Sequence, residues 1–164
     1  MADKQINRTV LSQQDSTALE EVGRIRIESD GKMYRYVKNS RTATYTKGTV
    51  MVIRSSDGYS VTGSRPVSAL FVGGKNSFAG VAAGTIGALK YGWVQYGGFC
   101  SNMKKRPLAT SIPIYGMLGV HSTCTQGAGF LSSSTLLGRH HRIGVNLKTV
   151  SSHCVCTAVL LRGN

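Results

Sequence analysis

The fold of this chain is decided by the stretch AGVAAGTIGALKYGWVQYGG, residues 79–98. It joins a run of small residues, a glycine-rich turn and an apolar segment that carries Trp93, the only tryptophan. Glycine within a strand marks a place where two backbones approach closely, and aromatic and branched residues favour strands. The stretch therefore predicts two strands, at about 78–83 and 91–96, and we expect their crowded backbones to meet at a subunit junction.

Two predicted hairpins precede this stretch. In residues 24–27 arginine and isoleucine alternate, which places the isoleucines on one face of a half-buried strand and the arginines on the other. The turn Asp30-Gly31 returns the chain as a second strand at 33–38. A hairpin of the same design joins strands at 50–53 and 59–62 through the turn Ser56-Asp57-Gly58. Two hairpins in succession indicate an antiparallel sheet.

Further segments of strand length, separated by Gly, Ser, Asn or Pro, lie at 67–72, 112–118, 142–147 and 154–161. Helical periodicity is confined to a possible short helix at 15–22 and a weaker one at 131–137. The pattern predicts an all-β protein, a small antiparallel barrel or sandwich.

One domain accounts for the length. A chain of 164 residues and 17.5 kDa buries about 70% of its unfolded surface in a single core. Residues 22–164 form the predicted β domain, and residues 1–21 are polar and form an extended N-terminal arm. This arm is either a strap onto a neighbouring subunit or a frayed terminus. We expect no signal peptide and no membrane partner, since the start lacks an apolar segment and no run approaches about 20 apolar residues.

The charges are unevenly distributed. All seven acidic residues lie within the first 57 positions, although the chain carries 20 basic residues and a formal charge of +13. From Gly58 onward ten basic residues have no carboxylate in their own half. The charge therefore favours an acidic partner, such as nucleic acid, an anionic membrane or an electronegative protein surface, and solubility through self-repulsion is the alternative explanation.

Two basic clusters stand out in that half: Lys104-Lys105-Arg106 and Arg139-His140-His141-Arg142. Either would suit phosphates or the carboxylates of a partner protein. Tyrosines that alternate along strands, such as Tyr34 with Tyr36, are a possible stacking platform for single-stranded nucleic acid. Packing in a core or an interface is the favoured interpretation of these tyrosines.

Catalysis is disfavoured by the missing carboxylates, because two thirds of the chain lacks the usual partner that orients a histidine. A cysteine nucleophile activated by a histidine is retained as an alternative hypothesis, but no local motif supports it. No phosphate-binding loop is complete, and no cofactor is expected. Cys100, Cys124, Cys154 and Cys156 are expected to be free, buried thiols. A zinc site with His121 and His153 is the less favoured alternative, because Cys-x-Cys is not the usual zinc knuckle.

Several short segments, taken together in their order and spacing, resemble the head decoration (cement) proteins of tailed phages. The resemblance covers roughly residues 22–162 and is carried by Gly31–Asn39, Lys47–Val50, Ala79–Ala82, Tyr91–Gln95 and Ala158–Leu161. It implies a β-tulip domain that assembles as a homotrimer on the outside of the expanded capsid, after synthesis in the host cytoplasm. The partner would be the major capsid protein, which such trimers staple together.

The resemblance leaves the contact residues open, so they come from charge and position. Capsid-binding candidates are Lys4, Arg8 and Leu11 of the arm, and Lys104, Lys105, Arg106, Arg139 and Arg142 of the basic clusters. Subunit-interface candidates are Tyr91, Trp93 and Gln95, although Trp93 is equally compatible with the core of the monomer. A nucleic-acid-binding protein is the alternative function, and a tail or adhesion module is the third.

Overall fold

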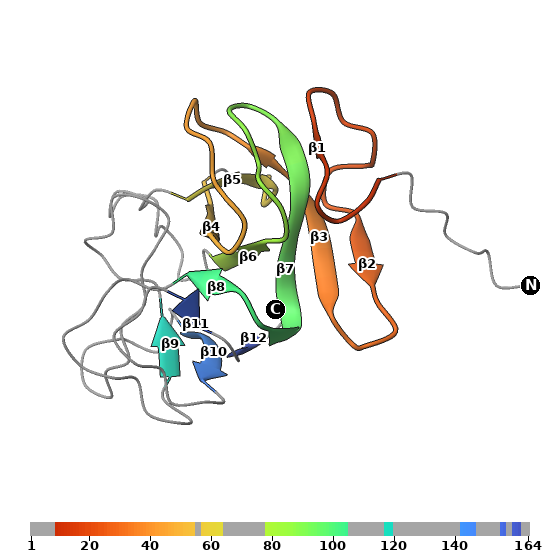
Figure 1. Ribbon diagram of the computed structural model, residues 1–164. Coiled ribbons are helices and arrows are strands. Elements are labelled where there is room, and N and C mark those ends of the chain that lie inside the picture. The colour runs from red at the N-terminus through yellow and green to blue at the C-terminus, as the bar shows by residue number, and fades with distance from the viewer. Residues whose placement is uncertain are drawn as a thin grey trace, which may run out of the picture.

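The computed structural model describes residues 9–54, 57–63 and 78–104, together with the backbone of four later strands. Within these residues no helix occurs, and the all-β prediction is confirmed. None of the described elements is a helix that could cross a membrane. Figure 1 shows the strands: β1 Gln14–Asp15, β2 Ile25–Ile27, β3 Met33–Asn39, β4 Val50–Ile53, β5 Ser60–Thr62, β6 Phe78–Ala82, β7 Tyr91–Cys100, β8 Met103–Lys104, β9 Met117–Gly119, β10 Arg142–Asn146, β11 Val155–Cys156 and β12 Val159–Leu161.

Five of these strands close into a barrel. β3 pairs with β5, β5 with β4, β4 with β6 and β6 with β7, and β7 returns to β3. The pairings are antiparallel except β3–β5, which is parallel with Asn39 opposite Val61. Residues 40–49 carry the chain past β5 to β4, so the second hairpin pairs with β3 through its later strand, β5, and with β6 through its earlier strand, β4.

The remaining strands extend the barrel. β2 continues the sheet beyond β3, β1 pairs with the start of β7, and β12 pairs with its end and leads to β10 and β9 (Figure 1). β8 pairs with β11 in a separate two-stranded sheet. The predicted strand at 67–72 and the weak helix at 131–137 lie outside the described residues.

The barrel core is apolar and combines inward-facing residues of the strands with Tyr45 and Ile86, which form an isolated bridge outside them. It contains Val37, Tyr45, Met51, Val61, Ala79, Ala82, Ile86 and Val94. The one hydroxyl of this set, on Tyr45, lies 3.0 Å from Oγ1 of Thr62 and is therefore hydrogen-bonded.

The crowding signalled by the glycines is found inside the subunit. Gly80 of β6 has φ +150°, and a Cβ there would lie 2.7 Å from the carbonyl oxygen of Gln95 on β7. A side chain would collide with the backbone of the neighbouring barrel strand. At this position the expectation of a subunit junction is replaced by close β6–β7 packing within one chain.

The orientation of β2 differs from the expected half-buried strand. Ile25 and Ile27 are 44% and 69% exposed, while Arg26 faces the protein. Ile25 and Ile27 lie opposite Arg35 and Met33, on the face of β3 that carries Val37 into the barrel. Because the barrel closes through β3–β7, β2 lies beyond the closure and this face of β2 meets no core.

The short helix predicted at 15–22 is wrong. Asp15 belongs to β1, where it lies opposite Tyr91 of β7, and residues 16–22 form bends and turns. The carboxylate of Asp15 accepts a hydrogen bond from the Tyr36 hydroxyl instead of capping a helix. This tertiary bond and the pairing with β7 outweigh a weak local helical preference.

Candidate anion-binding hollow

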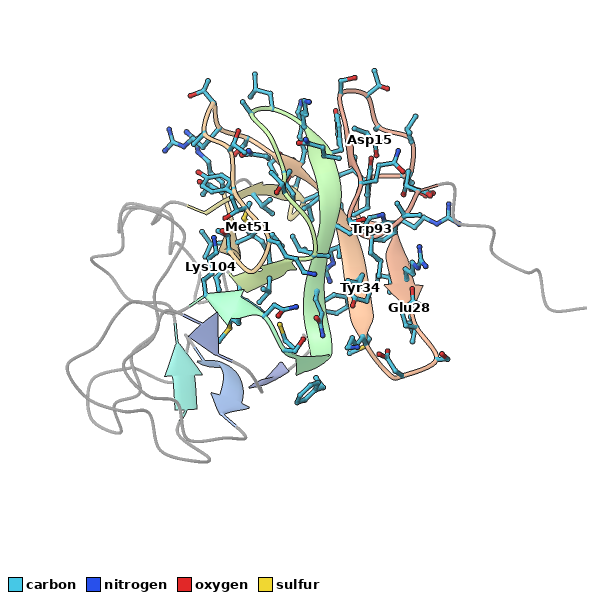
Figure 2. The ribbon with its side chains drawn as sticks, viewed as in Figure 1. Asp15, Glu28, Tyr34, Met51, Trp93 and Lys104 are labelled. Atoms are coloured by element: carbon cyan, nitrogen blue, oxygen red, sulfur yellow. The ribbon has the colours of Figure 1, made fainter. Side chains whose placement is uncertain are left out.

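The outer face of the barrel carries a second hydrophobic cluster, which we call the aromatic cluster: Tyr34, Tyr36 and Trp93. The Trp93 ring lies 5.2 Å from that of Tyr36 at an interplanar angle of 59°. Trp93 is fully buried within the single chain, whereas its neighbour Val94 enters the barrel core. Figure 2 shows Trp93 beside β3 and Met51 among the barrel strands.

The N-terminal segment, residues 9–22, covers this cluster. Leu11 packs against the aromatic cluster. Two hydrogen bonds from buried side chains of the cluster also hold the segment in place. Trp93 Nε1 donates to Thr9 Oγ1 at 2.9 Å, and the Tyr36 hydroxyl donates to Asp15 Oδ2 at 2.8 Å. Burial and the neighbouring Asp15 raise the pKa of Tyr36, so its hydroxyl remains a donor.

Glu20 holds the two ends of the N-terminal segment together. Its side chain is fully buried and accepts hydrogen bonds from the Thr9 backbone N–H at 3.1 Å and the Thr9 hydroxyl at 3.3 Å. Arg24 Nη1 donates to its other oxygen at 2.5 Å. The carboxylate is thus compensated by charge and by hydrogen bonds, as a buried charge requires.

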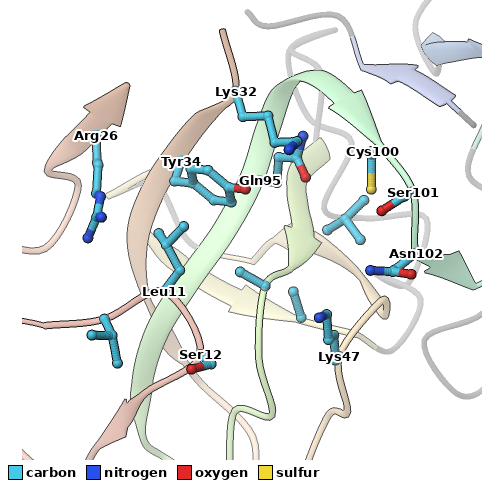
Figure 3. A pocket seen from close by; sticks show the side chains of 14 residues that line it. Leu11, Ser12, Arg26, Lys32, Tyr34, Lys47, Gln95, Cys100, Ser101 and Asn102 are labelled. Carbon is cyan, nitrogen blue, oxygen red and sulfur yellow. The ribbon is translucent and has the colours of Figure 1, made fainter. Parts of the chain in front are cut away.

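The cover stops short of the end of the outer face and leaves a hollow of about 430 Å³ (Figure 3). One wall is the N-terminal segment, the floor is formed by β3, β6 and β7, and the far wall by the turn after β7 and the turn before β4. The lining residues are Val10, Leu11, Ser12, Arg26, Lys32, Tyr34, Lys47, Val81, Ala82, Ala83, Gln95, Cys100, Ser101 and Asn102.

The hollow is positively charged. Arg26, Lys32 and Lys47 line it, and no lining residue carries a carboxylate. Arg26 pairs with Glu28 and Lys32 with Asp30, but both acids lie outside the lining. Among the described residues no carboxylate lies within ion-pair distance of Lys47. The arrangement therefore favours an anion over a cation or a neutral polar ligand.

Two uncharged groups complete the lining. Burial raises the pKa of the Tyr34 hydroxyl, which remains a neutral donor at physiological pH. Burial also raises the pKa of the Cys100 thiol, so a thiolate is disfavoured and Cys100 does not offer the charged nucleophile of a catalytic cysteine. Cys100 is a free, buried thiol as expected; the other three cysteine side chains lie outside the described residues.

Five acidic residues are engaged within the subunit. Asp15 and Glu20 anchor the N-terminal segment, Glu28 and Asp30 pair with basic neighbours, and Asp57 accepts hydrogen bonds from the turn into β5. Glu28, Asp30 and Asp57 are thus engaged by near neighbours in the sequence, whereas Asp15 and Glu20 are engaged by Tyr36 and Thr9 across the N-terminal segment. In the part of the chain that the structure describes, no ion pair reaches Arg41, Lys47, Lys90 or Lys104.

The structure places a few of the predicted contact residues. Leu11 packs on its own barrel and lines the hollow, and Lys104 donates a hydrogen bond to the Thr46 hydroxyl near the same turn as Lys47. Arg142 is placed only by its backbone in β10. Lys4, Arg8, Lys105, Arg106 and Arg139 lie outside the described residues.

The predicted subunit-interface residues belong largely to the interior of the monomer. Trp93 is fully buried, and Gln95 is 7% exposed with its amide donating to the carbonyl oxygens of Gly97 and Phe99. Tyr91 is partly buried and stacks on Tyr36 with centroids 6.1 Å apart. Trp93 has no surface left for a partner, and the buried Tyr36 cannot stack on a base.

The cations of the hollow were missed by the sequence reasoning. Arg26 and Lys32 belong to the β2–β3 hairpin and Lys47 to the turn before β4, so the three form no run of basic residues along the chain. Their only sequence signal is that each stands beside a turn or a strand edge. Among the described residues no group of three or more metal-ligating side chains comes together. Comparison of the chain with protein-family models, curated proteins and solved structures finds no match.

Proposed function

We propose that this chain is a non-enzymatic structural protein of a phage particle, a decoration protein that binds the major capsid protein on the outside of the expanded head. The observation that supports this most is the use of charge. The carboxylates of Asp15, Glu20, Glu28, Asp30 and Asp57 are engaged within their own subunit, so several cations of the barrel are left for an acidic partner surface. Docking on an electronegative shell would use that excess.

A homotrimer is part of the proposal, because a multivalent cement gains avidity from several weak contacts. The open edge of β2 is the described surface best suited to a contact between copies. β2 pairs only with β3 among the described strands, and it exposes Ile25 and Ile27. An exposed apolar edge strand invites pairing unless another surface covers it.

The N-terminal arm has a narrower role in this proposal than the sequence suggested. Thr9, Leu11, Asp15 and Glu20 all contact their own barrel, so a strap onto a neighbour would have to be formed by the residues before Thr9. Lys4 and Arg8 remain candidates for such a contact.

Gradient sedimentation of particles from infected cells tests the function. Unexpanded precursors, DNA-filled heads and nuclease-treated disrupted heads are separated and probed for this chain. Retention on expanded shells after DNA removal, with absence from precursors, is the expected result. Weaker binding to empty shells at 500 mM than at 50 mM salt would follow from charge-driven docking, because the screening length falls from about 14 Å to about 4 Å over this range.

The alternative is a nucleic-acid-binding protein, which the charge of +13 favours. That function predicts loss of the chain from disrupted heads together with the DNA, and a steep salt slope in DNA binding. The same gradient therefore separates the two functions.

A further inference from the structure

We propose that the hollow is a docking site for a carboxylate-bearing peptide segment of a partner protein. The inference rests on the proposed function, since it names where and how an acidic capsid surface would be held. Three cations converge there from β2, from the turn before β3 and from the turn before β4. A carboxylate entering the hollow meets positive charge on several sides and no acidic lining residue.

Lys47 is the cation best placed to receive that carboxylate. Arg26 and Lys32 already contact Glu28 and Asp30, while no described carboxylate lies within ion-pair distance of Lys47. Figure 3 shows Lys47 beside Asn102 across the hollow from Lys32, Tyr34 and Gln95. The amide of Asn102 and the hydroxyls of Ser12 and Ser101 add hydrogen-bonding groups to the lining.

The turn that carries Lys47 is fixed before any ligand arrives. Gly48 donates its N–H to Ala82 O at 2.9 Å and accepts from Lys104 N at 2.8 Å. At φ +84° a Cβ on Gly48 would lie 2.1 Å from the backbone oxygen of Asn102, so glycine allows this turn to pack closely against the turn after β7. A preorganised turn reduces the entropy lost on binding.

The apolar part of the lining favours a peptide over a phosphodiester chain. Val10, Leu11, Val81, Ala82 and Ala83 line the hollow together with the cations. A volume of about 430 Å³ lies in the usual range of about 300–1,000 Å³ for ligand sites. An acidic side chain followed by an apolar one can satisfy both halves of the lining, whereas a nucleic-acid backbone presents repeated charge and needs a continuous basic track.

The test uses the full chain and a fluorescein-labelled, end-blocked hexapeptide of alternating aspartate and leucine, followed by fluorescence anisotropy. The wild-type chain is expected to bind this peptide, and binding should weaken about five- to tenfold in Lys47→Gln. The matched control is Arg41→Gln, which removes one exposed cation outside the hollow and should change the affinity less than about twofold. Equal weakening in both variants would show that only net charge matters and would overturn the site.

Two further probes complete the experiment. The same peptide with asparagine in place of aspartate should not bind, and a labelled oligodeoxynucleotide of equal charge should bind more weakly than the acidic peptide. If the oligodeoxynucleotide binds more tightly than the peptide and its binding depends on Lys47, the proposed peptide ligand is wrong and the hollow binds nucleic acid. If the wild-type chain, Lys47→Gln and Arg41→Gln are all retained equally well on expanded heads, the proposed docking site is wrong while the decoration function stands.

Discussion

The barrel core and the aromatic cluster are built from alternate residues of the same strands, yet they are closed in different ways. Val94 points into a barrel that five strands close around it, while Trp93 points outward and is covered by the N-terminal segment. The interior closes as a consequence of strand pairing. The outer cluster is covered by a segment held through the β1–β7 pairing and through the hydrogen bonds that Thr9 and Asp15 accept from Trp93 and Tyr36, and where that cover ends the hollow begins.

This difference teaches that the two hydrophobic regions need not open together. Loss of the barrel core requires the strand ladders to break, whereas the cover can detach while the barrel remains paired. The hollow shares a wall with the cover through Leu11 and Ser12. Detachment of the cover is therefore expected to remove one wall of the proposed docking site.

The largest expected effect is that of Trp93→Ala. The change removes the central ring of the aromatic cluster and the hydrogen bond to Thr9, and should lower the free energy of unfolding by about 3–5 kcal/mol. Urea denaturation followed by circular dichroism measures the loss. Val94→Ala, on the adjacent residue, should cost less and leave the N-terminal segment resistant to protease, whereas Trp93→Ala exposes it. Equal protease sensitivity of both variants would contradict separate closure.

Glu20→Gln should lower the free energy of unfolding by about 2–3 kcal/mol. A broken buried pair costs about 3–5 kcal/mol, and the smaller value is expected because the Arg24 side chain is 20% exposed and can turn to water. Amide hydrogen exchange should show the loss concentrated in the N-terminal segment. The matched control Glu28→Gln breaks a pair with 22% and 31% exposed side chains and should cost at most about 1 kcal/mol.

The pH dependence should show the burial of Tyr36. Burial and Asp15 raise its folded-state pKa above the ordinary 10.0, so the neutral phenol is favoured in the folded chain. The contribution of Tyr36 to the free energy of unfolding is fully present below about pH 10 and is lost as the pH rises toward the folded-state pKa. Denaturation at pH 8, 10 and 11 should show this decline, and Tyr36→Phe should have a shallower alkaline decline. An unchanged decline in Tyr36→Phe would mean that other groups cause it.

The smallest effect on stability is expected at the open edge of β2. Ile27 is 69% exposed, so Ile27→Thr should change the free energy of unfolding by no more than about 0.5 kcal/mol. Sedimentation equilibrium should nevertheless show weaker self-association, because the exposed apolar edge is altered. Leu89→Asn, at another apolar residue that is 53% exposed, is the control and should leave self-association unchanged, since asparagine tolerates the positive φ of Leu89. Equal assembly of both variants with the wild-type chain would exclude the β2 edge as the subunit contact.

The hairpins could be predicted from sequence because their signals are local. Asp30-Gly31 and Asp57-Gly58 stand between segments of β-forming residues, and both connections are found between the expected strands. The parallel pairing of β3 with β5 could not be predicted in this way. It depends on which strand of the second hairpin reaches β3, and local periodicity does not encode that choice.

The candidate site could be predicted from the sequence less well than the hairpins. Of the two capsid-binding candidates whose side chains the structure describes, Leu11 lines the hollow and Lys104 does not, and the sequence reasoning favoured runs of basic residues. Arg26 was assigned to the solvent face of its strand because isoleucine is normally the buried partner of an alternating pair. Its position beyond the barrel closure reverses that assignment, and the isoleucines become the exposed side.

By itself the sequence determined that this is a basic, glycine-rich β protein whose acidic residues all precede position 58, because composition and turn chemistry are local properties. Tertiary structure alone decided which face of each strand is covered. Barrel closure through β3 and β7 brings Tyr36 and Trp93 under the N-terminal segment and gathers Arg26, Lys32 and Lys47 around one hollow. Alternation along a strand defines two faces, but only the packing of distant segments determines which of them meets water.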